Sequence, residues 1–262
     1  MVSPSEVQQV ANRVREGVRS FQYHEKGELE LPQDFNLASY IDHTAVTPDV
    51  QKHQVVKLCE EAKYYGFSSV FVTPTQFAFC VKQLEGSSVK ACSVAGFPLG
   101  AIFPEIKILE TKKLIQEGAN EVDMVINVGW VKDGCIEEVV EDILGVVHLG
   151  KEAGVAIKVI IETGLLSFSE RILATYIVKE CGADFVKTAT GFWGGGATIE
   201  DIEVMSQITN GVCRVKAAGG IRDRETAIRM IKAGASRLGS SAGISIVSGD
   251  TPFVDSSSPM EY

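Results

Sequence analysis

The stretch Ala183–Gly196 reads ADFVKTATGFWGGG and sets the pattern for the whole chain. It follows Gly182, where a helical pattern ends, passes through a short apolar segment at 185–188 and closes in a glycine-rich turn. A helix that returns to a short buried strand in this way is typical of parallel α/β sheets. Lys187 conflicts with its surroundings, because an ammonium in an apolar strand is costly unless it is paired or neutral.

The same strand pattern recurs outward in both directions from this stretch. Eight short apolar runs alternate with longer helical patterns between about residues 38 and 240. We predict strands at Leu37–Ile41, Ser69–Val72, Val89–Ala95, Glu121–Ile126, Ala156–Ile161, Phe185–Thr188, Val212–Ala217 and Arg237–Ser240. Each strand is short enough to be fully buried between helices.

Helical patterns fill the connections. In Pro104–Gly118, apolar residues at three- and four-residue spacing share one face, Pro104 suits a first turn and Gly118 a stop. Similar patterns predict helices at Pro48–Gly66, Ile136–Gly154, Ser169–Gly182, Thr198–Asn210 and Asp223–Gly234. Strand therefore follows helix along nearly the entire chain.

Eight strand–helix units can close into a barrel or remain an open doubly wound sheet. The count of strands and the length of 262 residues favour the α/β class and, within it, a (β/α)8 TIM barrel. We expect the barrel over residues 36–249, an N-terminal helical extension over 1–35 and a flexible, serine-rich C-terminal tail over 250–262.

Charge and composition exclude several classes of protein. A formal net charge of -9 and a pI near 5.1 argue against a general nucleic-acid or anionic-membrane surface. The six cysteines have no CxxC pair, which predicts neither a zinc site nor a disulfide framework. No secretory signal or spanning segment is evident, so we expect a soluble cytoplasmic protein without a metal or cofactor.

Three ionisable residues stand near the carboxyl ends of predicted strands, where parallel α/β folds place their chemistry. They are Asp123 in EVDMVIN, Lys187, and Lys216 at the end of VCRVK. Each alone is more often structural. Together they predict a site in which two lysines on neighbouring strands lower one amine's pKa and yield a neutral nucleophile for Schiff-base chemistry. Asp123 would then assist proton transfer, directly or through a water.

Other strand charges are predicted to be structural. Lys158 enters its strand early, so we assign it to a buried ion pair rather than to chemistry. Glu121 and Arg214 precede Asp123 and Lys216 by two residues each and should share their faces one layer deeper. These charges would satisfy one another inside the barrel, unless the register places one of them outside.

Glycine and hydroxyl residues follow the last three strands. Phosphate in barrels is often held by the loops after strands seven and eight. We therefore predict an anion site, here called the phosphate cradle, formed by Thr190, Gly191, Gly219, Gly220, Arg222, Gly239, Ser240 and Ser241. A single glycine pair would more often be only a turn, and Arg222 could merely face solvent.

On these residues the chain resembles the deoxyribose-phosphate aldolase family, from LASYIDHT (37–44) to RLGSS (237–241). The most specific segments are KVIIETG (158–164), ADFVKTATGF (183–192) and VKAAGGIR (215–222), with NEVDMVINVG (120–129) and CSVAGFPLG (92–100) in support. The resemblance implies a (β/α)8 barrel and a metal-free class I aldolase. Such an enzyme reversibly cleaves 2-deoxy-D-ribose 5-phosphate to D-glyceraldehyde 3-phosphate and acetaldehyde.

The resemblance also implies a role for each residue. Lys187 would form the Schiff base, Lys216 would lower its pKa and Asp123 would assist proton transfer. Asp42 would line the substrate pocket, and Tyr262 would match a terminal tyrosine that folds over the site in some members. The partners implied are phosphorylated sugar and aldehyde substrates and a second copy of the chain in a homodimer.

The chain departs from the family at two places. VFVTP (70–74) stands where some relatives have CIYP, so we expect no thiol trapping by aldehyde there. Phe192 and Trp193 stand where some relatives place a basic residue near the phosphate. Three functions therefore stay open: this aldolase, another phosphate-handling barrel enzyme, and a barrel that acts mainly as a binding or scaffold protein.

Overall fold

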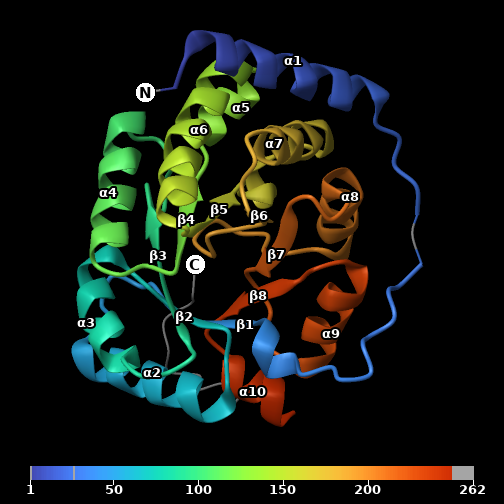
Figure 1. Cartoon of the computed structure of the whole chain (residues 1–262). Coiled ribbons are helices and arrows are strands. Elements are labelled where there is room, and N and C mark those ends of the chain that lie inside the picture. The colour runs from blue at the N-terminus through green and yellow to red at the C-terminus, as the bar shows by residue number, and fades with distance from the viewer. Residues whose placement is uncertain (1, 26, 250–262) are drawn as a thin grey trace.

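The structure is a computed structural model that describes residues 2–25 and 27–249. Eight parallel strands form a closed barrel in sequence order, and β1 pairs with β8 to complete it. The barrel is therefore the correct alternative, and the open doubly wound sheet is wrong. Figure 1 shows the helices surrounding the strands. The expected C-terminal tail, with Tyr262, lies outside the described residues.

The strands and helices alternate as predicted, with additional short helices. The strands are β1 Ile41–Ala45, β2 Ser69–Val72, β3 Lys90–Ala95, β4 Glu121–Val125, β5 Ala156–Ile160, β6 Phe185–Lys187, β7 Arg214–Ala218 and β8 Arg237–Ser240. The helices are α1 Pro4–Ser20, α2 Lys52–Tyr65, α3 Pro74–Leu84, α4 Pro104–Gln116, α5 Val128–Lys132, α6 Ile136–Ala153, α7 Phe168–Glu180, α8 Ile199–Thr209, α9 Arg224–Ala233 and α10 Gly243–Ser248. Short 3-10 turns occupy Leu37–Tyr40 and Thr163–Leu165. No helix in the described part of the chain is both long and apolar enough to cross a membrane.

Two predicted strands are displaced by local turns. The predicted strand Leu37–Ile41 is wrong, because the Asn36 side chain accepts a hydrogen bond from the Ala38 amide and caps a 3-10 turn; β1 begins only at Ile41. The seventh strand begins at Arg214 rather than Val212. Val212 instead lies in a turn that is closed by a hydrogen bond from the Val212 amide to the Thr209 carbonyl. Helix α3 was not predicted.

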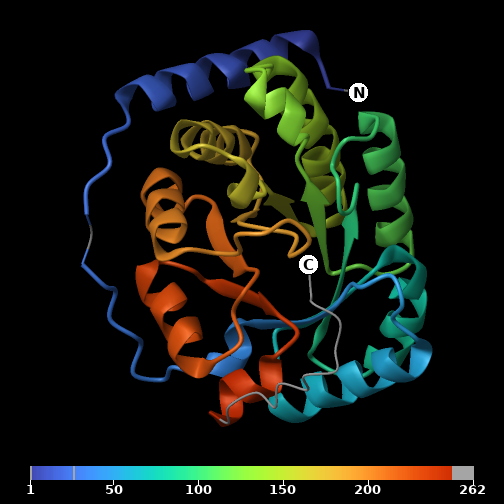
Figure 2. The ribbon, with the colours of Figure 1, turned by 180° about the vertical axis from the view of Figure 1, so that it is seen from behind.

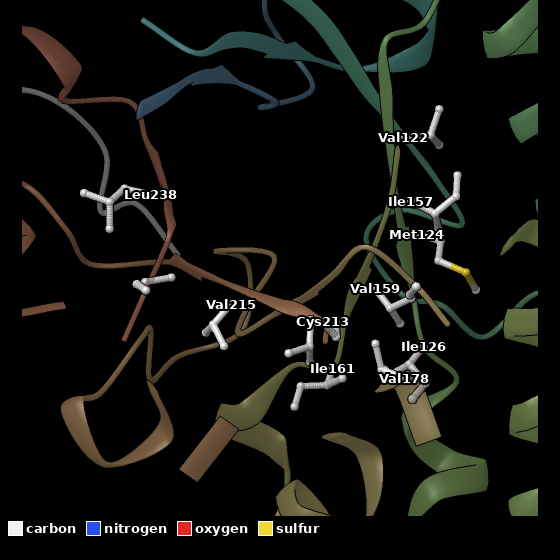
Figure 3. Close-up of a cluster of buried hydrophobic side chains, with 14 of the residues drawn as sticks. Val122, Met124, Ile126, Ile157, Val159, Ile161, Val178, Cys213, Val215 and Leu238 are labelled. Atoms are coloured by element: carbon white, nitrogen blue, oxygen red, sulfur yellow. The ribbon is translucent and has the colours of Figure 1, made fainter. Parts of the chain in front are cut away.

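The two faces of the barrel wall differ in chemistry. Outward-facing strand residues join the helices in one large apolar core, which includes Val159 of β5 and Val178 of α7. Figure 3 shows part of this cluster, with Val122 and Met124 of β4 in it. The inward face has only a small apolar cluster, formed by Phe71, Cys92, Val94, Val125 and Ile160. The rest of the interior is largely occupied by charged side chains.

The N-terminal extension packs against the outside of the helical ring. Helix α1 buries Val7, Val10 and Val14 against α6 and α7. Figures 1 and 2 show α1 lying across these helices, after which the chain descends outside α8 and α9. The Leu29 amide donates a hydrogen bond of 2.8 Å to the Lys232 carbonyl, and this bond attaches the segment to α9. The extension thus ties together four consecutive helices of the ring.

Substitution of Gly150 tests the packing of α6 on the barrel. A Cβ at Gly150 would lie 2.3 Å from Ile157 Cγ1 and 2.7 Å from the Val155 carbonyl oxygen. Gly150→Ala should therefore destabilise the fold by about 1–3 kcal/mol, although alanine is the better helix former. Chemical denaturation measures the change.

Gly129→Ala is the matched control, because a Cβ at that helical glycine meets its nearest neighbour at an ordinary 3.4 Å. This variant should match or slightly exceed the wild-type free energy of unfolding. Equal stability of both alanine variants would contradict the close approach of α6 to β5.

Candidate active site

Three strands deliver the predicted catalytic groups to one point inside the barrel. Lys187 of β6 donates to Asp123 Oδ2 at 2.8 Å, and Lys216 of β7 donates to the same oxygen at 3.1 Å. Lys187 and Lys216 are paired directly in the β6–β7 register. All three side chains are at most 3% exposed. The structure thus brings together the three residues that the sequence singled out.

A second group of charges lies beside this triad. Lys158 contacts Asp123 Oδ1 at 2.9 Å and Glu121 Oε2 at 2.7 Å, in keeping with the buried ion pair expected for it. Arg237 of β8 contacts Glu121 at 3.0 Å and Asp42 at 2.7 Å. A continuous network of ion pairs therefore crosses the barrel interior and joins side chains of β1 with those of β4 to β8.

Asp42 belongs to this network and is fully buried. It lies 2.6 Å from the Lys216 ammonium and accepts a hydrogen bond of 2.6 Å from the Ser69 hydroxyl. Burial opposes ionisation of Asp42, but Lys216 and Arg237 outweigh it and lower the pKa of this carboxyl. The direct structural effect of Asp42 is to hold Lys216 in place.

Arg214 does not fill its predicted place. It begins β7 at the exposed end of the barrel and stacks on the Phe185 ring, with its guanidinium carbon 3.9 Å from the ring centre. Arg237 instead supplies the guanidinium that pairs with Glu121. The predicted pairing of Arg214 with the interior charges is therefore wrong, because the first residue of β7 still reaches solvent.

Burial shapes the acidity of Lys187 most strongly. Removal from water lowers the pKa of this amine to about 8, the nearby Asp123 carboxylate opposes the shift, and Lys216 adds to it. The sequence pattern predicts that the second lysine, Lys216, lowers the pKa of Lys187. The direction is as predicted, but desolvation is the largest cause and repulsion by Lys216 is secondary.

The other two interior lysines behave in the opposite way. Burial also disfavours their charged forms, but carboxylates outweigh it and raise the pKa of both Lys158 and Lys216. The same lysines, with Lys187, hold the pKa of Asp123 well below its usual range despite burial. Lys187 is thus the member of this lysine group that is set to lose its proton near neutral pH.

An aromatic ring lies beside Lys187 and Lys216. Phe71 of the VFVTP segment has its ring centre 4.4 Å from the Lys187 nitrogen and 4.8 Å from the Lys216 nitrogen. Cation–π attraction favours the protonated forms and opposes part of the desolvation. The departure from CIYP therefore places an aromatic face, rather than a thiol, in the β2 wall beside Lys187.

The loops of the predicted phosphate cradle meet at the carboxyl ends of β6, β7 and β8. A Cβ at Gly196 would lie 2.6 Å from the Gly219 carbonyl oxygen, and the Ala197 amide donates to that oxygen at 3.0 Å. Gly219 and Gly220 have φ of 93° and 76°, a conformation that glycine adopts without strain. Glycine is needed here because the two backbones touch.

The hydroxyl and amide groups of the cradle are partly engaged. The Ser240 hydroxyl donates to the Ile221 carbonyl at 2.6 Å and accepts from the Ala242 amide at 3.0 Å. The Thr190 amide donates to Glu162 at 3.0 Å. Arg222 and Ser241 are exposed to solvent. Gly191 is also exposed and has φ of 92°. Gly239 lies within β8, directly after Leu238. The cradle residues thus surround one rim of the barrel mouth.

The bulky pair after Gly191 turns from the cradle toward β3 and β4. Phe192 packs edge-on against Phe97, with ring centres 5.2 Å apart. Trp193 is 39% exposed and lines a pocket of about 170 Å³ together with Val125 and Glu162. The Phe192–Trp193 segment therefore forms an apolar wall on the β3–β5 side of the mouth.

A protein-family model for DeoC/LacD family aldolases matches residues 36–249. The chain belongs to the DeoC/LacD aldolase family. It is 50% identical over 214 residues to a deoxyribose-phosphate aldolase of Staphylococcus saprophyticus, which covers 82% of this chain and 96% of the relative. It is 52% identical over 216 residues to one from a Geobacillus species, with the same coverage.

Solved structures show the same likeness. A candidate deoxyribose-phosphate aldolase from Coccidioides immitis superposes with a TM-score of 0.86 at 36% identity, covering 92% of this chain and 96% of that one. The tetrameric deoxyribose phosphate aldolase of Aeropyrum pernix has a TM-score of 0.76 at 29% identity, covering 94% and 97%. Both support the eight-stranded barrel described above.

Three further residues contact the site without a sequence pattern that predicts them there. Arg237 is the first residue of RLGSS. It pairs with Lys216 in the β7–β8 register, so its side chain lies on the same inward face as that of Lys216. Glu162 lies within the quoted segment KVIIETG but carries no pattern that marks it as buried. Ser69, which bonds Asp42, is an ordinary strand serine until the β1–β2 register is known.

The acidity of Lys187 predicts a pH profile. Because its pKa is about 8, the neutral fraction and the rate of borohydride-trapped Schiff base with acetaldehyde should rise about tenfold per pH unit below that value and level off above about pH 9. Lys216→Met removes a charge that lowers this pKa, so the midpoint should move upward by about one unit.

Lys82→Met is the control for general charge effects, because Lys82 is exposed on α3. Its midpoint should equal that of the wild type. An unchanged midpoint in Lys216→Met, or a downward shift, would contradict the electrostatic account of the lysine pair.

Proposed function

We propose that this protein is an aldolase that reversibly cleaves 2-deoxy-D-ribose 5-phosphate to D-glyceraldehyde 3-phosphate and acetaldehyde through a Schiff base at Lys187. The observation that carries the proposal is a buried amine with a pKa of about 8, held 2.8 Å from the Asp123 carboxylate. Relatives at about half identity over most of the chain are named deoxyribose-phosphate aldolase.

The first half of the reaction uses Lys187 as a nucleophile. Its neutral amine attacks the C1 aldehyde of the open-chain sugar, and loss of water gives an iminium. The iminium withdraws electrons from the C2–C3 bond. A charged iminium takes the place of the ammonium beside Asp123, so the same carboxylate stabilises it.

The second half breaks the carbon–carbon bond. Asp123, acting through a water, accepts the proton of the 3-hydroxyl as the C2–C3 bond breaks, which releases glyceraldehyde 3-phosphate and leaves an enamine. Protonation of the enamine carbon and hydrolysis of the resulting iminium release acetaldehyde and restore the amine. Lys216, held by Asp42 and Asp123, supplies the fixed positive charge that keeps Lys187 easily deprotonated.

The phosphate cradle holds the other end of the substrate. We assign the phosphate to the loops that contain Thr190, Gly191, Gly219, Gly220, Arg222, Gly239, Ser240 and Ser241. The contact between Gly196 and Gly219 supports this assignment, because it brings the β6 and β7 loops together at the mouth. Anchoring there positions C1 at Lys187, and positioning lowers the barrier of the chemical step.

Domain organisation and assembly form a second part of the proposal. Residues 36–249 act as the catalytic barrel, and residues 1–35 as an extension that braces it. We propose a homodimer, supported by an exposed apolar surface on the β3–α4 connection and α4, formed by Leu99, Phe103, Ile106 and Leu109. Cysteine usage supports a reducing, cytoplasmic compartment.

A barrel that only binds or scaffolds is the alternative function. Such a barrel would not need a buried lysine with a lowered pKa, since an apolar residue at that position costs less free energy of folding. The complete set of Asp123, Lys187 and Lys216 in mutual contact favours the enzyme.

Substitution of Lys187 tests the reaction itself. Lys187→Leu should lower the turnover of 2-deoxy-D-ribose 5-phosphate by at least about 1,000-fold, because Lys158 and Lys216, whose pKa values are raised, stay protonated and do not replace the lost nucleophile. Borohydride trapping with acetaldehyde followed by peptide mapping should label Lys187 in the wild type. Lys82→Leu serves as the control and should retain wild-type turnover.

Two results would defeat this assignment. One is equal turnover by wild type and Lys187→Leu. The other is a covalent label on Lys158 instead, which would make the protein a different Schiff-base enzyme.

Substitution of Ser241 tests the phosphate cradle. Ser241→Asp places a carboxylate beside the proposed phosphate, so KM for 2-deoxy-D-ribose 5-phosphate should rise by roughly tenfold or more through like-charge repulsion. Trapping of acetaldehyde, which has no phosphate, should be unchanged. Ser5→Asp, at an exposed position of α1, controls for net charge. An unchanged KM would place the phosphate elsewhere.

A further inference from the structure

Glu162 occupies an unusual position at the carboxyl end of β5. It has φ of 55°, in the left-handed region, and its side chain is only 1% exposed. Its neighbours continue the β5–β6 ladder: the Ile161 amide donates to the Lys187 carbonyl and the Thr163 amide to the Thr188 carbonyl, each at 2.9 Å. Glu162 is therefore fixed between two bonds to the strand that carries Lys187.

The turn that contains Glu162 is held rigid from outside the barrel. Arg171 of α7 donates to the Thr163 carbonyl at 3.1 Å and to the Leu166 carbonyl at 3.0 Å. A Cβ at Gly164 would lie 2.4 Å from the Gly194 carbonyl oxygen, so the turn also touches the glycine-rich loop after β6. Such support is typical of a residue whose direction matters.

Only half of the Glu162 carboxyl group is satisfied. Its Oε2 accepts the Thr190 amide at 3.0 Å, whereas Oε1 is buried and has no hydrogen-bond partner. A buried carboxyl oxygen without a donor costs free energy comparable to a lost hydrogen bond. Burial raises the pKa of Glu162, while Thr190 and Lys187 act against the rise. A donor that reached Oε1 would relieve this cost.

The surroundings of Glu162 indicate where such a donor would come from. It lines the 170 Å³ pocket at the barrel mouth, where the other lining residues are Pro98, Leu99, Val125, Val128, Leu165 and Trp193. Among these residues Glu162 has the one ionisable side chain. Val125 lies on the inner face of β4, two residues beyond Asp123, so the pocket lies on the mouth side of Asp123.

Glu162 also lies on the path between the two ends of the substrate. The register pairs Ile160 with Lys187, and Glu162 follows Ile160 by two residues. Its partner Thr190 belongs to the phosphate cradle, three residues after Lys187. The carboxyl group thus lies between the amine that takes C1 and a loop that takes the phosphate. The carbons that cross this span carry the 3- and 4-hydroxyls, of which Asp123 serves the first.

We propose that Glu162 is a specificity-determining residue that accepts a hydrogen bond from the 4-hydroxyl of the sugar phosphate, which is the 2-hydroxyl of glyceraldehyde 3-phosphate. The role rests on the proposed aldolase function. Contact requires a shift of the pocket wall at Trp193, which its exposure of 39% and the three glycines after it permit. The carboxyl group then selects acceptor aldehydes that bear a hydroxyl next to the carbonyl.

The test compares two acceptors in the aldol direction. Wild type and Glu162→Gln are assayed for addition of acetaldehyde to glyceraldehyde 3-phosphate and to 3-oxopropyl phosphate, which lacks the hydroxyl. Glutamine keeps the shape and can still accept the Thr190 amide, but it loses the carboxylate acceptor. The wild-type preference in kcat/KM for the hydroxylated acceptor should fall roughly tenfold in the variant, with little change for the analogue.

Two controls separate this role from a structural one. Glu170→Gln, in the first turn of α7 directly after this connection, keeps the α7 capping box and should preserve the wild-type preference. Glu162→Ala removes the tie to Thr190 as well, so both acceptors should suffer, but the hydroxylated one by an additional factor of about ten.

Two outcomes would overturn the proposal, and they are distinguishable. Equal losses for both acceptors, or no loss for either, would show that Glu162 does not contact the hydroxyl, while wild-type activity would leave the aldolase function standing. Failure of the wild type to add acetaldehyde to glyceraldehyde 3-phosphate would overturn the aldolase function and this role together.

Discussion

The carboxylate of Asp123 is the contact on which the site depends. It lies within 3.1 Å of the ammonium nitrogens of Lys158, Lys187 and Lys216, which come from three successive strands. In a flat sheet, β4 and β7 would lie about 14 Å apart, at about 4.8 Å per strand. Closure of the barrel, with the inward tilt of side chains from each strand, is therefore what makes the contact with Lys216 feasible. Fold and site are coupled through this one group.

The balance of charge around Asp123 explains why one lysine differs from the rest. Lys90 of β3, which is exposed, contacts Glu121 from the edge of the network. The buried set consists of three carboxylates, on Asp42, Glu121 and Asp123, and four basic groups, on Lys158, Lys187, Lys216 and Arg237. With every basic group protonated, this set carries an excess positive charge in a water-poor interior. Release of one proton neutralises it. Lys187, at the mouth side of the network, is the group whose pKa falls.

The glycine-rich loops convert this charged interior into a site of defined shape. Backbone contacts link Gly164 to Gly194 and Gly196 to Gly219, so the connections after β5, β6 and β7 support one another. The same arrangement explains two features that the sequence left open. Phe192 and Trp193 form an apolar wall against Phe97 and above Val125, on the side of the mouth away from β8. Glu162 presents the single ionisable side chain in that wall.

Much of the fold was predictable because the local signals agree with one another. Glycine returns and apolar runs located seven strands to within a residue or two, whereas Leu37–Ile41 failed because Asn36 caps a 3-10 turn instead of leading into a strand. The positions of Asp123, Lys187 and Lys216 followed from strand ends. The pairing of Arg237 with Glu121 did not, because contacts across a barrel depend on the stagger of eight strands and not on spacing along any one of them.

Among the three lysines inside the barrel, Lys158, Lys187 and Lys216, we expect Lys187 alone to lose its proton near neutral pH. An NMR titration of isotopically labelled lysine side chains, with the Lys187 signal assigned by its absence from Lys187→Leu, measures this directly. The account predicts a midpoint of about 8 for Lys187, while Lys158 and Lys216 remain protonated to a higher pH than an exposed lysine. A Lys187 midpoint near 10.4, the ordinary value for lysine, would contradict it.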